Sequence, residues 1–441
     1  MELKKYKLGE ILDVTRGASL SGEFYATEGK YIRLTCGNFD YQNNCFKENK
    51  SKDNLYYIGD FKPEFLMEEG DIITPLTEQA IGLLGSTAII PESGKYIQSQ
   101  DVAKIICKEE LLDKDFVFYL ISSTLVKQQL SAAAQQTKIR HTSPDKIRDC
   151  TVWIPELTEQ KRIGKLLRSL DRKIELNRAI NQNLEAMAKQ LYDYWFVQFD
   201  FPNENGKPYK SSGGKMVWNE KLKREIPKGW NVLKLGEHCS FNKRTSNGYF
   251  NHPILYLDTS NITNNTIDEL QFLNPSSDII PSRARRLVQE GDIVYSTVRP
   301  NLKHFGIIMN PDYNMVVSTG FAVITANWSA YRYFIYQFLI QAATIENLST
   351  IAQSAVSAYP SINTSDIENL DLVVPPDSMI EKYAKTACRL YLQIDTNYKE
   401  IKSLTKQRDE LLPLLMNGQV SVNSDLSVYK KRRGKSPPPR F

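Results

Sequence analysis

The chain has 441 residues, 41% of them hydrophobic, and a formal net charge of +5. No apolar run approaches the roughly 18 residues of a membrane-spanning helix, and no apolar core follows the first residues, so we expect a cytoplasmic protein without membrane contact. The cations of residues 430–440 contribute +6 of the net charge and leave −1 for the rest of the chain. This balance excludes a uniformly basic nucleic-acid-binding body, so any such binding must use local patches or a basic partner.

The first part of the chain predicts a mixed α and β region. Residues 5–112 show short strand patterns interrupted by Gly, Asn, Asp and Pro, and a helical pattern follows near residues 114–132. After a polar turn, residues 152–155 form an apolar extended piece that ends at Pro155. A proline there closes the extended piece, so we expect a long helix to begin soon after it.

That helix is predicted from an apolar seam. Its positions run from Ile163 through Leu167, Leu170 and Ile174 to Trp195, in steps that alternate between four and three residues. This spacing is typical of a coiled coil. A helix of roughly 35–40 residues would be on the order of 50–60 Å long.

Residues 200–229 show no sustained period and are predicted to be a linker. Beyond them the same order of elements recurs. Strand patterns occupy residues 231–326, a helical pattern lies near 329–349, an extended piece covers 372–375, and a second seam runs from Tyr383 to Leu415. The chain is therefore an internal repeat with one long helix closing each half.

The two copies align most strictly in the helices. Residues 147–195 and 367–415 align without a gap at an offset of 220, whereas the offset of the upstream blocks drifts between 227 and 219. The upstream blocks have thus gained and lost loop residues while the helices have not. Variable loops on a constant frame are typical of recognition surfaces.

One polar residue type recurs within the seam. Asn177 and Asn397 hold the same seam position, 220 residues apart. A buried polar residue at such a position usually fixes coiled-coil register at some cost in stability. We predict this register role for both residues, with an accidental solvent-facing position as the alternative.

The sequence lacks the common catalytic patterns. It has no G-x-x-x-x-G-K-[ST] loop before a helix, no G-x-G-x-x-G after a strand, no G-x-S-x-G elbow and no Asn/Asp-Pro-Pro-aromatic tetrapeptide of adenine methyltransferases. Its six Cys and four His show no ligand spacing, so we expect reduced thiols and no metal site. These observations favour a binding scaffold. A stand-alone nuclease with two DNA-reading halves, or a coiled-coil tether unrelated to DNA, remain as alternatives.

Several segments together resemble one family. Residues 154–163 (IPELTEQKRI), 170–177 (LDRKIELN) and 407–418 (QRDELLPLLMNG) resemble the conserved helices of specificity subunits of Type I restriction–modification systems. Residues 226–230 (IPKGW) resemble the start of a second target recognition domain. The resemblance covers about residues 5–420 in the family's order. The second copy departs from the first where Met379 and Ile380 replace a Glu-Gln pair.

The resemblance implies an α+β fold with two pseudo-repeated target recognition domains separated by two long antiparallel coiled-coil helices. On this basis we expect recognition domains at residues 1–152 and 230–372, and conserved helices at 153–199 and 373–420. The linker at 200–229 and a basic, disordered tail at 421–441 complete the predicted division.

The resemblance also implies a function without chemistry in this chain. Each recognition domain would read one half of a bipartite, asymmetric sequence in double-stranded DNA. Two methylation subunits and the restriction subunits would dock on this frame and carry out adenine methylation and cleavage. S-adenosylmethionine, ATP and Mg are therefore expected on the partner subunits, and no cofactor or metal on this chain.

Base readers should be polar and basic residues on loops of the recognition domains. Two stretches in each half fit this description. One, at residues 74–79 and 296–303, follows the repeated Glu-Gly-Asp turn at residues 69–71 and 290–292; the other, at residues 135–142 and 353–360, precedes the last extended piece. In the family the latter loop approaches DNA. For any single residue a solvated side chain is the alternative, and for Arg16, Lys243 and Arg244 phosphate contact and plain surface charge are both open. The predicted DNA-binding residues are Arg16, Thr74, Thr77, Gln79, Gln136, Thr137, Lys138, Arg140, His141, Lys243, Arg244, Ser296, Arg299, Asn301, Lys303, Ser354, Ser357 and Tyr359.

Overall fold

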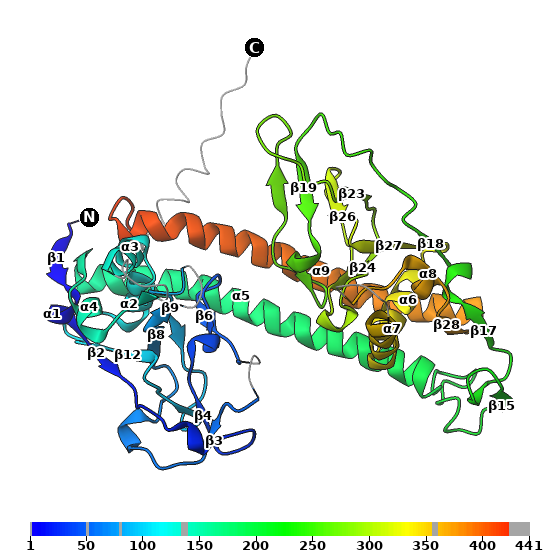
Figure 1. Ribbon diagram of the computed structural model, residues 1–441, viewed down its shortest axis with the longest axis horizontal. Helices are drawn as coiled ribbons and strands as arrows, with labels where there is room; N and C mark the ends of the chain where they lie inside the picture. The colour runs from blue at the N-terminus through cyan, green and yellow to red at the C-terminus, as the bar shows by residue number, and fades with distance from the viewer. Residues whose placement is uncertain (1, 50–52, 79–81, 134–139, 355–359, 423–441) are drawn as a thin grey trace, which may run out of the picture. The chain divides into compact units, whose positions relative to one another are not determined.

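The structure is a computed structural model that describes residues 2–49, 53–78, 82–133, 140–354 and 360–422 (Figure 1). The chain forms two compact units, and each is described by itself. The first unit consists of Met1–Glu175 with Ile401–Phe441, and the second of Leu176–Glu400. Two long helices run through both units.

The first unit contains two four-stranded sheets. One is antiparallel in the order β10-β8-β12-β2, with β2 at Leu12–Arg16, β8 at Ile72–Pro75, β10 at Ala88–Ile89 and β12 at Val102–Cys107. The other has the order β11-β4-β7-β3, with β3 at Tyr25–Ala26, β4 at Tyr31–Arg33, β7 at Tyr56–Tyr57 and β11 at Tyr96–Ile97. In this second sheet β11 and β4 are parallel.

Short pairs and helices complete this unit. The strand pairs are β1 (Lys4–Lys7) with β14 (Thr151–Ile154), β5 (Phe39–Asp40) with β6 (Cys45–Phe46), and β9 (Thr77–Glu78) with β13 (Arg140–His141). The helices are α1 (Leu8–Ile11), α2 (Lys114–Ile121), α3 (Thr124–Ala133) and α4 (Pro144–Arg148). Because β1 pairs with β14, the first and last strands of the domain close on each other.

The second unit repeats this topology. Its antiparallel sheet has the order β18-β27-β24-β25, formed by β18 (Cys239–Phe241), β24 (Ile293–Ser296), β25 (Phe305–Ile307) and β27 (Phe321–Ala326). Its second sheet has the order β22-β19-β26-β23, formed by β19 (Ile254–Leu257), β22 (Gln271–Leu273), β23 (Ala284–Leu287) and β26 (Met315–Ser318). Here too one pair, β19 with β26, is parallel.

The smaller elements of the second unit also correspond. The pair β17 (Asn231–Lys234) with β28 (Asp371–Val374) matches β1 with β14, and β20 (Ile262–Thr263) with β21 (Thr266–Ile267) matches β5 with β6. The helices are α6 (Tyr331–Leu339), α7 (Ala342–Ser354) and α8 (Thr364–Glu368). The shared strand order of the antiparallel sheets, together with a parallel pair in each second sheet, confirms the predicted pair of pseudo-repeated α+β domains.

The repeated Leu-Gly-Glu segment, residues 8–10 and 235–237, is held by the same contacts in both halves. The backbone amides of Lys7 and Lys234 donate to the carboxylates of Glu10 and Glu237, at 2.8 and 2.7 Å. The leucine before each glycine is fully buried. A Cβ at Gly9 would lie 3.1 Å from the side chain of Arg148 on α4, so only glycine allows this close approach comfortably.

The shorter helical pattern of each half is divided in two. The sequence predicted one helix near 114–132 and one near 329–349, but the structure has α2 and α3 in the first and α6 and α7 in the second. In the first pair the break lies at Ser122 and Ser123. The hydroxyl of Ser122 donates to the carbonyl oxygens of Phe118 and Tyr119, which competes with continued helix formation.

The segment predicted as a linker, 200–229, contains ordered structure. It forms a hairpin of β15 (Met216–Asn219) and β16 (Arg224–Pro227). Phe201 stacks on Tyr209 and Trp230 with ring centroids 4.6 and 5.0 Å apart, and Ile226 is buried in the same core. Aromatic packing rather than a regular hydrophobic period orders this segment, so the periodicity could not reveal it.

The long helices match their predicted lengths. Helix α5 covers Leu157–Tyr192 with 36 residues and continues into a π-helical turn at Asp193–Val197, and α9 covers Asp377–Met416 with 40 residues. In the second unit their antiparallel pairing is seen directly, because Asn397 donates to Asn181 at 2.8 Å and Asn177 donates to Glu400 at 2.8 Å. None of the described helices is both long enough and apolar enough to cross a membrane.

The seam departs from its predicted path by one residue at Leu191, where the neighbouring Tyr192 is buried instead, and at Leu170. Leu170 is only partly buried, and the neighbouring Asp171 takes the buried position instead. The same shift occurs in the second copy, where Tyr391 is buried and Leu390 is partly exposed. Asn177 and Asn397 are both buried, which excludes the solvent-facing alternative. They do not pair with each other, and their role in register stays a prediction.

Candidate DNA-binding surfaces

In the first recognition domain the structure joins the two predicted stretches. Strand β9, from the stretch after the Glu-Gly-Asp turn, pairs with β13, so that Thr77 lies opposite His141. The hydroxyl of Thr77 and Nδ1 of His141 are 3.2 Å apart, and the amide of Thr142 donates to the carbonyl of Leu76 at 2.8 Å. Backbone pairing therefore fixes two loops that lie about sixty residues apart in the sequence.

The second domain joins the corresponding stretches in the same way. Val298 pairs with Ser361, the amide of Arg299 donates to the carbonyl of Pro360 at 2.9 Å, and the amide of Ile362 donates to that of Thr297 at 2.8 Å. Val298 and Ser361 lie 221 and 220 residues after Thr77 and His141. The junction is thus the same feature of the repeat in both domains.

Only some of the residues predicted in the first domain are exposed there. His141 and Arg16 are exposed, and Nε of Arg16 donates to the carbonyl of Gln100 at 2.8 Å. Thr74 is 0% exposed, and its hydroxyl donates to the carbonyl of Ser86 at 2.8 Å. Its side chain has no surface to offer to DNA, so we remove Thr74 from the set. Thr77 is also buried, and its hydroxyl serves mainly to hold His141.

The second domain gathers several predicted residues on one surface. Arg299, Asn301 and Lys303 are exposed at the short 3-10 helix η7 (Pro300–Leu302), and Ser354 is exposed at the end of α7. A pocket between these two elements is lined by residues of both, including Arg299, Asn301, Gln353 and Pro360. Cations and amides beside a pocket can contact both phosphates and base edges.

The backbone around η7 is held in an uncommon conformation. Arg299 has φ of +49° and Lys303 has φ of +59°, in the left-handed region that non-glycine residues seldom adopt. Such residues cost about 1 kcal/mol or more each and persist where surrounding contacts hold them. The hydrogen bond from Arg299 to Pro360 is one such contact.

Two further predictions need correction. Ser296 is buried in β24, where its hydroxyl donates to the carbonyl of Val298 at 2.9 Å, so it is removed from the set. Arg244 forms an ion pair at 2.5 Å with Asp292, whose side chain is completely buried. The guanidinium of Arg244 thus neutralises a core carboxylate, which makes it a structural residue. Lys243 beside it is exposed.

The remaining predicted residues cannot be placed. Gln79, Gln136, Thr137, Lys138, Ser357 and Tyr359 lie outside the described residues, and for Arg140 only the backbone pairing with Glu78 is described.

The sequence analysis missed a pair of positioning residues. Asn44 and Asn265 have φ of +53° and +64°, each at the turn of a small hairpin. Asn44 Oδ1 accepts from the amide of Thr87 at 2.8 Å, and Asn265 Oδ1 accepts from the amide of Ile307 at 2.9 Å. Each therefore ties its hairpin to an edge of the antiparallel sheet, just before β10 in the first domain and at the end of β25 in the second. The signal was an Asn-Asn dipeptide that recurs 221 residues apart.

The six cysteines, all within the described part of the chain, form no disulfide. Burial raises the pKa of Cys150 to about 11 and that of Cys239 to about 12. Within the part of the chain that the structure describes, no cluster of His, Cys, Asp and Glu side chains could hold a metal ion.

Comparisons with known proteins agree with this architecture. A family model for the Type I restriction modification DNA specificity domain matches residues 1–186 and 227–406. The Type I restriction enzyme MjaIX specificity subunit of Methanocaldococcus jannaschii is 25% identical over 334 residues, covering 74% of this chain and 73% of that protein. The Type I restriction enzyme HindI specificity subunit of Haemophilus influenzae is 28% identical over 171 residues, covering 38% of this chain and 36% of that protein.

A solved structure shows the same fold. The crystal structure of the S subunit of a Type I restriction–modification system from M. genitalium covers 94% of this chain and 96% of its own, with a TM-score of 0.55 and 16% sequence identity. The family model matches each of the two repeated halves and most of the chain. The chain therefore belongs to the family of Type I restriction–modification DNA specificity subunits.

Proposed function

We propose that this chain chooses the DNA sequence for a Type I restriction–modification complex, and that each recognition domain reads one part of a bipartite, asymmetric target. The observation that carries the proposal is the equivalent junction in the two domains. In both, the stretch after the Glu-Gly-Asp turn is tied by backbone hydrogen bonds to the stretch before the last strand. The backbone frame is the same, but the side chains differ, as two readers of different sequences require.

The chemistry of the exposed side chains supports reading in a groove. In the first domain His141 offers an imidazole that Thr77 orients. In the second, Arg299, Asn301 and Lys303 offer cationic and amide donors. Arg and Lys pair with guanine or phosphate, and Asn pairs with adenine. These side chains can select and position DNA, and chemistry on the DNA would come from other subunits.

The proposed partners are double-stranded DNA, two methylation subunits and restriction subunits. S-adenosylmethionine, ATP and Mg would be bound by those subunits. We therefore expect the purified chain, incubated with DNA and S-adenosylmethionine, to transfer no methyl groups, and to cleave no DNA when Mg is added. Robust methylation or cleavage by the isolated chain would refute this division of labour.

The central test exchanges one recognition domain. Residues 1–150 would be replaced by the corresponding domain of another specificity subunit, and the hybrid would be assembled with its methylation subunits. The methylated sequence, determined by single-molecule sequencing, should change in one half and keep the other. The reciprocal exchange of residues 230–372 is the matched control and should change only the opposite half. A change of both half-sites in either hybrid would contradict modular reading.

A further inference from the structure

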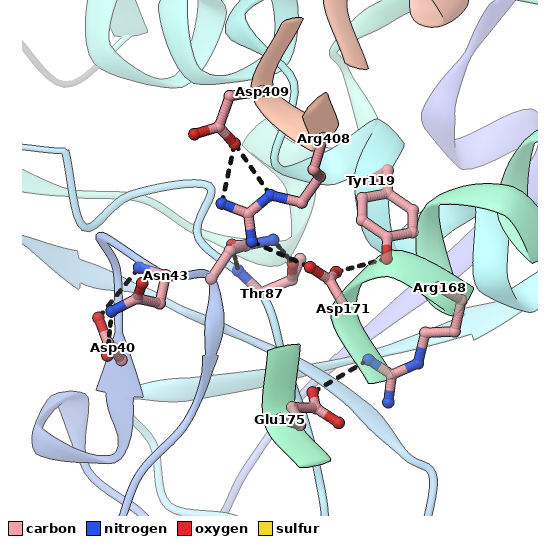
Figure 2. A network of polar contacts seen from close by, with 10 residues as sticks. Asp40, Asn43, Thr87, Tyr119, Arg168, Asp171, Glu175, Arg408 and Asp409 are labelled. Carbon is pink, nitrogen blue, oxygen red and sulfur yellow. Dashed lines mark hydrogen bonds and ion pairs between the residues drawn. The ribbon is translucent and has the colours of Figure 1, made fainter. Parts of the chain in front are cut away.

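A buried ion pair joins the two long helices in the first unit. Nη1 of Arg408 on α9 lies 2.9 Å from Oδ1 of Asp171 on α5, and the hydroxyl of Tyr119 on α2 donates to Oδ2 of the same carboxylate (Figure 2). Asp171 and Arg408 are each 8% exposed. Asp409 binds the outer side of the Arg408 guanidinium at 2.8 to 2.9 Å.

The environment stabilises the charged form of Arg408. Burial by itself would lower the pKa of Arg408, but Asp171 and Asp409 outweigh burial and raise it. Burial raises the pKa of Tyr119, and Asp171 raises it further, so the phenol stays a proton donor to the carboxylate. Two opposite charges and a donor therefore satisfy one another inside the seam.

The repeat-equivalent positions in the second unit carry no charge. At the offset of 220, Asp171 corresponds to Tyr391 and Arg408 corresponds to Ala188. Tyr391 and Ala188 are both buried in the core of that unit, and Gln337 on α6 donates to the Tyr391 hydroxyl at 2.8 Å. The same position of the seam thus holds an ion pair in one unit and an uncharged pair in the other.

Side-chain size differs between the units in a second, independent way. The core of the second unit packs Tyr192, Trp195 and Phe196 of the α5 end with Tyr383 and the small Ala387 of α9. The rings of Phe196 and Tyr383 are 4.9 Å apart. The equivalent positions in the first unit are aliphatic, with Leu412, Leu415 and Met416 facing the same core as Ile163 and Leu167.

We propose that these differences make each half of the chain bind the other half and reject a second copy of itself. The N-terminal half is residues 1–199 and the C-terminal half residues 230–420. Two N-terminal halves paired in the same antiparallel register would place Asp171 opposite Ala188 of the second copy. Two C-terminal halves would place Arg408 opposite Tyr391. In each arrangement the buried charge loses its counter-ion on the other half, and Asp171 keeps only Tyr119 while Arg408 keeps only the more exposed Asp409, which destabilises the pair.

Size complementarity opposes the same pairings. In a pair of N-terminal halves, Leu167 would meet Tyr192 and Trp195 instead of the shorter Leu412 and Leu415, and the seam would be overpacked. In a pair of C-terminal halves, Ala387 would meet Leu412 and Leu415 instead of aromatic rings, which leaves a cavity. The partner that fits each half is therefore the complementary half, supplied by the same chain or by a second one.

The test uses the folded full chain, cut once. A protease site inserted between Asn205 and Gly206, in an exposed turn, would leave two pieces held together only by noncovalent contacts. Native mass spectrometry then reports which pieces associate. For the wild-type sequence we expect complexes of one N-terminal and one C-terminal piece. Abundant pairs of like pieces would overturn the proposal.

Charge reversal tests the ion pair within the same design. Cut Asp171→Arg protein would be mixed with cut Arg408→Asp protein. Before the pieces exchange, each complex holds two like charges at this position, two arginines in one protein and two aspartates in the other. After exchange, every complex can hold one arginine and one aspartate. We expect complexes with opposite charges to exceed the like-charged ones by about tenfold or more. Mixing cut Asp171→Arg protein with cut Lys406→Asp protein is the matched control, because Lys406 is 75% exposed on the same helix. Equal preference in both mixtures would refute the proposal.

A measurement on the uncut chain covers the case in which cut variants aggregate. Asp171→Arg and Arg408→Asp should each lower the urea midpoint of unfolding far more than Lys406→Asp does. The double variant, which restores opposite charges, should recover most of that loss. Single effects no larger than the control, or a double variant no better than the singles, would show that this ion pair does not choose the partner.

Discussion

The two recognition domains fix their loops with the same backbone hydrogen bonds but place different chemistry beside them. The first domain has a hydroxyl–imidazole pair at the junction, Thr77 with His141. The second has Val298 with Ser361 there and carries its exposed cations, Arg299 and Lys303, at the two ends of η7. Main-chain pairing therefore holds the two loops in the same place in both domains, which leaves their side chains free to differ.

The ion pair at the Glu-Gly-Asp turn is buried to different degrees in the two domains. The aspartate of the Glu-Gly-Asp turn is Asp71 in the first, where Lys104 pairs with it at 2.7 Å and both side chains retain some exposure. In the second it is Asp292, which is completely buried and receives Arg244 and the hydroxyl of Thr325. The second domain therefore depends more strongly on its charge pair.

The largest expected effect comes from breaking that pair. Arg244→Met should destabilise the protein by about 3 kcal/mol, because it leaves a buried carboxylate without its counter-ion. Lys104→Met removes the partner of the more exposed Asp71 and should cost about 1 kcal/mol or less. Urea unfolding followed by circular dichroism measures both. Similar losses in the two variants would contradict the inferred difference in burial.

The next effect concerns DNA binding by the second domain. Arg299→Ala and Lys303→Ala should each weaken binding of the assembled complex to its target by about tenfold and reduce the salt dependence of binding. Lys223→Ala is the control, since Lys223 is exposed on the β15–β16 hairpin, away from the predicted loops. Affinity would be measured by fluorescence anisotropy at several salt concentrations. A loss for the control equal to that for Arg299→Ala would argue against a local contact surface.

These examples also show what a sequence can and cannot reveal. The two seams, from Ile163 to Trp195 and from Tyr383 to Leu415, were predictable because helical periodicity indicates a buried face. Where the structure departs from them the shift is one residue, to Asp171, Tyr192 and Tyr391. The loop junctions were predicted as stretches, but not as pairs. Nothing local to Thr77 or Val298 indicates which distant strand each will meet.

Individual site residues were less predictable for a different reason. Thr74 and Ser296 are of polar residue types that are common on surfaces. Both are nevertheless buried in strands, and each hydroxyl donates to a nearby backbone carbonyl. The partner of Arg244 lies 48 residues away in the sequence. Burial of a polar group depends on such tertiary partners, and a pattern of residue types does not contain them.

A smaller effect is expected for Asn44 and Asn265, whose side chains hold the two small hairpins in place. Asn44→Gly and Asn265→Gly keep the left-handed backbone but remove the side-chain hydrogen bonds, so each should cost about 1 kcal/mol. Asn265→Gly should cost more, because Asn265 Nδ2 donates to the carboxylate of Glu185 on α5 at 3.1 Å, whereas Asn44 Nδ2 donates to the neutral hydroxyl of Thr87 at 2.8 Å. Unfolding midpoints measure the difference. If Asn44→Gly proved the more damaging variant, the carboxylate acceptor would give no advantage over the hydroxyl acceptor.

The smallest expected effect concerns Glu185, which accepts the hydrogen bond from Asn265. Burial raises the pKa of the Glu185 carboxyl above its ordinary value, and the hydrogen bond from Asn265 only partly opposes this. The folded state therefore binds the proton more tightly than the unfolded state does, and stability is lost as the pH rises from the unfolded pKa through the folded one. Glu185→Gln keeps an acceptor for Asn265 and removes the charge. It should raise stability near pH 7 by less than about 1 kcal/mol.

That gain should disappear below a pH of about 4, where the carboxyl is protonated in both states. Urea unfolding of the two proteins across this range is the measurement. Glu175→Gln is the control, because Glu175 is half-exposed on the same helix and pairs at 3.4 Å with Arg168. Its substitution removes a favourable contact and should give no gain at pH 7. A gain for Glu185→Gln that stayed constant down to low pH would show that burial of the charge is not its cause.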